Sequence, residues 1–215
     1  MNQIVKDKMQ RQIMVVKNSI LFKNTKRIDG FLSVSENFEE IILKNYEYMV
    51  RGQAEVNTDY KQPIPYGVVI NDENKVFVYK RGGISSNAGE SRLHSKISFG
   101  VGGHIEVDDK VSKNLLRETL LREVEEEINI SENDINKVEV LGYINDDNSD
   151  SYSTYHLGVA YLIYVKNSNI ALLDGELEKG EFLSLKEIEE MMNSGEYDIE
   201  TWSKIIYDEI KKYLS

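Results

Sequence analysis

Residues 100–130 hold the densest pattern in the chain: a glycine-rich turn runs into an acidic loop and then into a segment with helical spacing. If residues from about 114 to 128 are helical, each advances by roughly 100° around the axis. Apolar side chains then recur every four residues and form a stripe suited to packing under a sheet. They are Leu116, Leu120, Val124 and Ile128, with Leu121 beside them. The helix is therefore predicted to have one anchored side and one charged side.

The charged side of this helix predicts a metal site. Glu123, Glu126 and Glu127 fall within roughly a third of its circumference, and carboxylates this close repel one another. A divalent cation would offset that repulsion, and oxygen-only ligands suit Mg²⁺ or Mn²⁺. Arg122 stands one helical turn before Glu126 and is expected to orient the carboxylates from their flank. A solvated acidic face is the alternative interpretation of the same residues.

This stretch resembles the Nudix box, whose pattern is G, five residues, E, seven residues, then R-E-U-x-E-E-x-G-U with U aliphatic. The segment from Arg122 to Ile130 matches the second half at every position except one. Asn129 stands in the place of the glycine, and asparagine is the next-best residue for the left-handed conformation that ends a helix.

The first half of the pattern is less well matched. Residues 102–106, Gly-Gly-His-Ile-Glu, are similar to the family's G-G-x-U-E opening. Gly103 lies nineteen residues before Arg122 where the pattern allows fourteen, so five residues are inserted. The pattern's first glutamate falls on Asp109 when counted forward and on Asn114 when counted back, which leaves it without a secure counterpart.

The resemblance implies an α/β fold, a Nudix-type α/β/α sandwich with a mixed β-sheet, in residues 61–215. Residues 1–60 would form an N-terminal α+β extension that packs on the catalytic domain or makes a homodimer contact. The implied activity is Mg²⁺- or Mn²⁺-dependent hydrolysis of a diphosphate linkage in a small nucleotide-like substrate, a nucleoside diphosphate derivative.

The resemblance also implies roles for particular residues. Glu123 would accept the proton of the attacking water, Arg122 would orient the carboxylates, and Glu126 would complete the catalytic set. The implied metal ligands are Glu123, Glu126, Glu127, Glu181 and Glu106. The groups expected to meet substrate phosphates, because they precede the box or lie in its glycine turn, are Arg81, Arg92, Lys96, His104, Gly102 and Gly103. His94 and His156 have no metal-like spacing with His104.

Composition limits the partners. The chain of 215 residues carries 26 Lys and Arg against 37 Asp and Glu, a formal charge of −11, which disfavours a nucleic acid polymer as partner. Its 40% hydrophobic residues predict a globular protein. No apolar run has the length of a membrane span or the character of a signal peptide, so a cytoplasmic protein without a membrane partner is expected.

Two alternative functions have a basis in the same residues. An isoprenoid diphosphate isomerase has this architecture and a similar GGH turn, but its chemistry uses a cysteine and the chain has none. A non-catalytic Nudix-like nucleotide-binding or sensor module commonly loses box glutamates, whereas all three helix glutamates are present here.

Periodicity and turn residues predict the remaining elements. We expect a hairpin over Gln12–Phe22, a helix from Glu36 to about Val50, and prolines 63 and 65 at the entrance to a strand. Strands are then expected over residues 66–70, 75–80, 97–101, 138–144 and 156–165. A late strand carrying Glu181 should lead into a helix that begins near Lys186 and ends at Ser194-Gly195. The final helix should bury Trp202.

Overall fold

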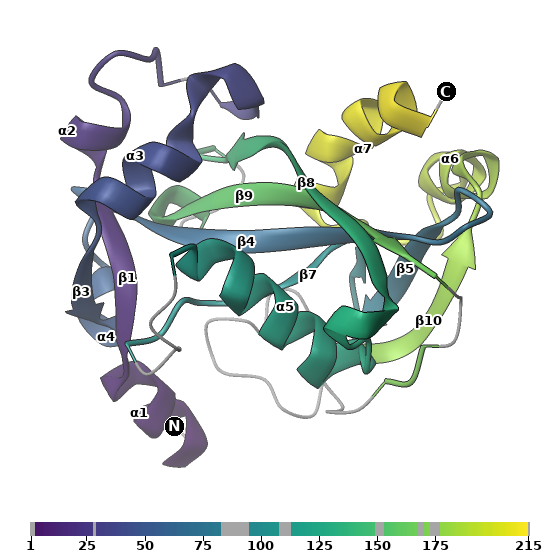
Figure 1. Ribbon diagram of the computed structural model, residues 1–215, viewed down its shortest axis with the longest axis horizontal. Helices are drawn as coiled ribbons and strands as arrows, with labels where there is room; N and C mark the ends of the chain where they lie inside the picture. Colours follow the sequence, from purple (N-terminus) through teal and green to yellow (C-terminus); the bar gives the residue numbers. More distant parts are fainter. Residues whose placement is uncertain are drawn as a thin grey trace. The chain divides into compact units, whose positions relative to one another are not determined.

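The computed structural model describes residues 3–27, 29–82, 95–107, 113–148, 153–166, 170–172 and 177–214 (Figure 1). Its helices are α1 Gln3–Gln10, α2 Asn18–Leu21, α3 Phe38–Asn45, α4 Arg51–Ala54, α5 Leu115–Ile128, α6 Leu185–Ser194 and α7 Thr201–Leu214. Its strands are β1 Gln12–Lys17, β2 Gly30–Ser33, β3 Glu47–Val50, β4 Tyr60–Ile70, β5 Val76–Arg81, β6 Ile97–Ser98, β7 Val101–Gly102, β8 Ile135–Asn145, β9 His156–Val165 and β10 Leu177–Leu183. Among the described residues no helix is long and apolar enough to cross a membrane.

The main sheet has the strand order β10-β5-β4-β9-β8-β2. Beside this path β1 pairs with β4 and β3, β6 pairs with β5, and β7 pairs with β4. The α/β fold class expected from the sequence is therefore confirmed. Two compact units divide the chain, and several of these elements contribute residues to both. Unit 1 consists of Met1–Tyr66, Gly102–Leu120 and Val140–Ala160, and unit 2 of Gly67–Val101, Leu121–Glu139 and Tyr161–Ser215.

In unit 1, β1 is a central strand rather than half of a hairpin. Its four inner residues, 13–16, are buried, and it pairs antiparallel with β3 from Gln12↔Val50 to Val15↔Glu47. The segment after Lys17 is the short helix α2, so the hairpin predicted over Gln12–Phe22 is wrong. Asn18, in the middle of the predicted hairpin, makes a long-range contact: its Nδ2 donates a hydrogen bond to the Thr58 carbonyl over 2.7 Å.

The helix predicted from Glu36 to about Val50 is also wrong in extent. Helix α3 begins after Asn37, which adopts a left-handed backbone conformation with φ 55°, and it ends at Asn45. The last residues of the predicted helix form β3, which lies beside β1 in Figure 1. Pairing with β1 overrides the helical spacing of these residues, since it satisfies their backbone groups while Met49 packs against buried Ile13 and Val15.

The prolines lie inside a strand and not at its entrance. Strand β4 begins at Tyr60 and continues through Pro63 and Pro65 to Ile70, and every residue after Tyr60 is buried. The predicted start at Tyr66 is therefore six residues late. A proline lacks a backbone donor but keeps the extended φ of a strand, so it is tolerated where no ladder hydrogen bond requires its nitrogen.

The strands expected over residues 66–70 and 75–80 lie in β4 and β5, which are joined as a hairpin. Strands β4 and β5 meet at Ile70↔Val76, and the Oδ1 atom of Asn71 accepts hydrogen bonds from the backbone nitrogens of Glu73 and Lys75. Strand β10 then pairs antiparallel along β5, as Figure 1 shows. Its register shifts between Glu178 and Gly180, so the late strand is irregular at its centre.

Other elements of unit 2 agree with the sequence patterns in part. Ser184 caps α6 through a capping box with Glu187, and Gly195 ends that helix at φ 71°. The predicted strand over 97–101 is broken into β6 and β7. Helix α7 buries Ile206 and Ile210, whereas Trp202, expected in the core, is only partly buried. The two strands expected after the box helix are confirmed as β8 and β9.

Candidate active site

Helix α5 has the two sides that its sequence predicts. The stripe is fully buried, with exposed fractions of 0% for Leu116, Leu120, Val124 and Ile128. Asn114 caps the first turn, because its Oδ1 accepts a hydrogen bond from the backbone nitrogen of Arg117 over 3.0 Å. Asn129 ends the helix with φ 55°, as the asparagine in place of the pattern's glycine predicts. One of the two counted positions for the first box glutamate is thus occupied by a helix cap.

Arg122 joins two of the box carboxylates. Its Nη2 lies 2.9 Å from Oε1 of Glu123, and its Nη1 donates to Oε2 of Glu126 over 3.0 Å. The Glu123 side chain is 15% exposed and that of Glu126 is 59% exposed. Arg122 therefore contacts both carboxylates within unit 2, as the helical spacing of the sequence predicts. Glu127, the third box glutamate, is buried with an exposed fraction of 6%.

Glu127 belongs to a buried polar group around Tyr79. The hydroxyl of Tyr79 donates to the carbonyl of Gly100 over 2.7 Å. Burial raises the pKa of Tyr79, Arg81 lowers it, and the negative charges of Glu127 and Glu200 raise it further. The charges of Glu127, Arg81 and Glu200 therefore all act on the Tyr79 hydroxyl. These three side chains lie in one neighbourhood of unit 2.

The two described cations expected to meet phosphate already have carboxylate partners. Arg81 Nη2 lies 3.6 Å from Oε1 of Glu200, and Lys96 Nζ lies 3.7 Å from Oδ2 of Asp198. Sequence reasoning missed Glu200, which also accepts a hydrogen bond from the hydroxyl of Ser98. Glu200 belongs to no sequence motif. It lies beside β6 because the neighbouring residue Ile199 forms a parallel bridge with Ile97. Arg92, His94 and Asp109 lie outside the described residues.

Glu181 lies on β10 opposite Val78 and is exposed. It borders a shallow cavity of about 380 Å³ in unit 2 together with Asn71, Glu73, Lys75, Phe77, Ile170, Gly180 and Phe182. No box glutamate is among these described lining residues. Gly180 fits beneath an aromatic ring, because a Cβ there would lie 2.3 Å from Phe77.

The fold of unit 1 requires a glycine at position 102, in the glycine-rich turn. A Cβ on Gly102 would lie 1.9 Å from the carbonyl oxygen of Pro65, so β7 and β4 approach too closely for any side chain. Glu106, an expected metal ligand, forms an ion pair with Arg11, whose Nη1 donates to both carboxylate oxygens over 2.9 and 3.0 Å. A backbone bridge between Ile13 and Glu106 fixes this segment on β1.

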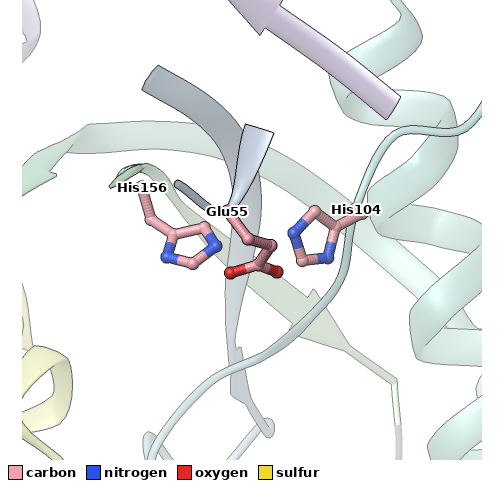
Figure 2. Close-up of side chains that lie close together, drawn as sticks. All are labelled: Glu55, His104 and His156. Atoms are coloured by element: carbon pink, nitrogen blue, oxygen red, sulfur yellow. The ribbon is translucent and has the colours of Figure 1, made fainter. Parts of the chain in front are cut away.

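The structure also gathers a cluster that sequence spacing does not reveal. The potential ligand atoms of Glu55, His104 and His156 all lie within 4.8 Å of one another in unit 1, the one such group found among the described residues (Figure 2). The two imidazole rings are 5.5 Å apart with planes at 72°. His104 and His156 have no metal-like spacing in the sequence, because the three residues come from separate segments and meet only in the fold.

These features define the class of protein. The family model of the NUDIX domain matches residues 61–202, a range that contains the whole box helix, and the chain belongs to this family. The Nudix-type α/β fold expected from the sequence is thereby confirmed.

Particular relatives extend the similarity beyond the matched domain. The chain is 33% identical over 210 residues to protein YmaB of Bacillus subtilis (strain 168), covering 94% of this chain and 98% of that protein. It resembles the crystal structure of Tm1382, a protein assigned to the Nudix hydrolases, with a TM-score of 0.74, 27% identity, and coverage of 94% of this chain and 99% of that one. The NUDIX domain of Shewanella oneidensis NrtR, solved with ADP ribose, shares the fold at a TM-score of 0.55 and 13% identity, over 72% of this chain and 89% of that one.

Proposed function

We propose that this protein hydrolyses a diphosphate linkage in a nucleoside diphosphate derivative in the presence of Mg²⁺ or Mn²⁺. The observation that carries the proposal is the contact of Arg122 with both Glu123 and Glu126, on a helix whose next glutamate, Glu127, is buried. This is the arrangement expected of residues that match the second half of the Nudix box.

The donor set of α5 fits the cation. Glu123, Glu126 and Glu127 offer only carboxylate oxygens from adjacent positions of one helix, and such ligands suit a hard divalent ion. Glu127 in particular is a buried carboxylate beside other charges, and buried carboxylates are normally paired or bind metal. When bound, the ion would neutralise phosphate oxygens and lower the pKa of a water towards about 7. Glu181 remains a proposed further ligand, and Glu106 a proposed ligand or helper.

The protein's own groups would perform the remaining tasks. Glu123, partly shielded from solvent and held by Arg122, would accept the proton of the attacking water. Arg81 and Lys96 would meet the phosphates, where a substrate oxygen would take the place of the carboxylates that lie 3.6 and 3.7 Å from them. A nucleotide such as the ADP ribose bound by the NrtR domain has the required diphosphate.

Product release from a substrate panel tests the proposal. The purified chain would be incubated with Mg²⁺ and nucleoside diphosphate sugars, dinucleoside polyphosphates or ADP-ribose, and the phosphate products would be separated by chromatography. We expect release of a nucleoside monophosphate from at least one class, and its loss in chelator. Binding of these compounds without turnover would instead favour the non-catalytic nucleotide-binding module, which the helix cap at Asn114 in place of a box glutamate also allows.

A further inference from the structure

The cluster of Glu55, His104 and His156 lies outside the residues of the proposed reaction. Glu55 directly follows α4, His104 belongs to the glycine turn, and His156 is the first residue of β9. Figure 2 shows the Glu55 carboxylate lying between the two imidazole rings. Three potential ligands from three separate segments thus point at one small region of unit 1.

Glu55 has an unpartnered oxygen in this region. The residue is 8% exposed, and its Oε2 atom is buried with no hydrogen-bond partner. The other oxygen, Oε1, accepts a hydrogen bond from Nε of Arg51 over 3.2 Å, and both side chains of this pair are below 10% exposed. A buried carboxylate oxygen without a partner is costly. Arg51 therefore fixes and partly neutralises the carboxylate through Oε1 and leaves Oε2 without a hydrogen-bond partner.

The histidines are suited to act as ligands. His156 is 9% exposed. One ring nitrogen of each histidine lies within 4.8 Å of the other and of a carboxylate oxygen of Glu55. A neutral imidazole has a lone pair for a metal, whereas an imidazolium has none.

A neighbouring amide completes the surroundings. Oε1 of Gln62 lies 2.8 Å from Nε2 of His104, so the amide can hold the ring in position. Gln62 is 1% exposed and its Nε2 is buried with no hydrogen-bond partner. Two residues that lie beside His104 thus each have a buried polar atom without a hydrogen-bond partner, Oε2 of Glu55 and Nε2 of Gln62. A metal ion with a bound water would provide a positive charge for Oε2 of Glu55 and an acceptor oxygen for Nε2 of Gln62.

We propose that Glu55, His104 and His156 form a binding site for a transition-metal ion of the Zn²⁺ class. Two imidazoles and one carboxylate, with a position left for water, are a ligand set typical of Zn²⁺. Mg²⁺ requires oxygen ligands and binds such a set poorly. This site is formed by other residues than the box carboxylates and selects a softer ion. His104, expected from sequence to meet a phosphate, serves here as a metal ligand.

Metal binding by the full-length, untagged chain tests this site. After removal of metals, the protein would be titrated with Zn²⁺ in millimolar Mg²⁺, so that oxygen-only sites are occupied by the harder ion. We expect one equivalent of Zn²⁺ to bind. The isosteric variant Glu55→Gln and the variant His156→Asn should each bind Zn²⁺ about 10- to 100-fold more weakly or worse, with unchanged circular dichroism.

The matched control removes a carboxylate of the box helix. Glu126→Gln should keep the wild-type affinity for Zn²⁺. Substitution of Co²⁺ provides a readout that does not depend on any variant folding, because bound Co²⁺ with nitrogen ligands should give visible absorption bands that Zn²⁺ abolishes by competition. Unaltered Zn²⁺ affinity in both Glu55→Gln and His156→Asn would overturn the proposal, as would the absence of Zn²⁺ binding by the wild type. Neither result depends on whether the chain hydrolyses diphosphates.

Discussion

Arg122 donates from Nη1 to Oε2 of Glu126 over 3.0 Å, across one turn of α5. The same guanidinium lies 2.9 Å from Glu123, so one cation holds two carboxylates that would otherwise repel each other. Glu126 is 59% exposed, and an exposed ion pair of this kind adds little to stability. The Glu126 carboxylate is therefore expected to contribute little to the stability of the fold.

Substitution of Glu126 separates its role in activity from its role in stability. Glu126→Gln should lower kcat by about 100-fold or more, because it removes a charge proposed to hold the cation. The free energy of unfolding should change by no more than about 0.5 kcal/mol, since the side chain is largely in solvent. Steady-state kinetics on the best compound of the substrate panel and urea unfolding measure the two effects. Glu125→Gln is the control and should retain activity, because Glu125 is exposed and occupies the unrestricted x position of R-E-U-x-E-E. A fully active Glu126→Gln variant would contradict the proposal that Glu126 is a metal ligand.

The box helix could be predicted because its information is local. A four-residue apolar repeat fixes which side of α5 is buried, and Leu116 and Val124 are both inaccessible. Arg122 and Glu126 meet because residues one turn apart are neighbours on any helix. The conformation of Asn129 follows from the limited set of residues that adopt positive φ. These features require no knowledge of the rest of the chain.

Features that depend on distant segments could not be predicted in this way. The residues of β3 have helical spacing but become a strand because β1 is available to pair with them. Glu55 and His156 have no spacing that marks them as ligands, and they meet His104 only because three separate segments converge. A single sequence gives the chemical character of such residues but not which of them become neighbours.

Asn129 provides a test of the departure from the box pattern. Its φ of 55° is unfavourable for most residues but accessible to asparagine and glycine. Asn129→Gly should therefore change the free energy of unfolding by less than about 0.5 kcal/mol, while Asn129→Ala should lower it by about 1 kcal/mol. Urea unfolding of both variants checks this. Equal stability of the alanine and glycine variants would show that the left-handed conformation is not maintained.

Gly102 should tolerate substitution far less well than Gly195, for a different reason. A Cβ at residue 102 would lie 1.9 Å from a backbone oxygen of Pro65, which cannot move without displacing β4. We expect Gly102→Ala to lower the free energy of unfolding by about 3 kcal/mol or more. Gly195 has φ 71° and no atom within 4 Å of the added carbon, so Gly195→Ala should cost only about 1 kcal/mol. Thermal or urea unfolding would reveal the order, and a reversed order would contradict the close approach of β7 and β4.

Asp147 holds two cations in unit 1, one of them completely buried. Its carboxylate accepts hydrogen bonds from Lys61 Nζ over 2.7 Å and from Arg27 over 2.7 and 2.8 Å. Lys61 is 0% exposed and Asp147 is 21% exposed at the side chain. Asp147→Asn removes the carboxylate that is hydrogen-bonded to the buried Lys61, so we expect a loss of about 2 to 3 kcal/mol, less than for a pair with both members buried. Asp72→Asn, at an exposed turn, is the control, and Lys61→Met combined with Asp147→Asn should recover part of the loss.

The pH dependence of this loss follows from the pKa of Asp147. Burial alone would raise that pKa, but the hydrogen bonds from Arg27, Lys61 and Asn145 outweigh burial and hold it well below its usual value. A carboxyl whose pKa is lower in the folded than in the unfolded state contributes its full stability above the unfolded pKa of about 3.9. That contribution fades as the pH falls towards the folded value. The difference in free energy of unfolding between wild type and Asp147→Asn should thus be the same at pH 7 and pH 5 and should shrink below about pH 4. Urea unfolding at several pH values measures it, and a difference that grows as the pH falls would contradict the ion pair as its source.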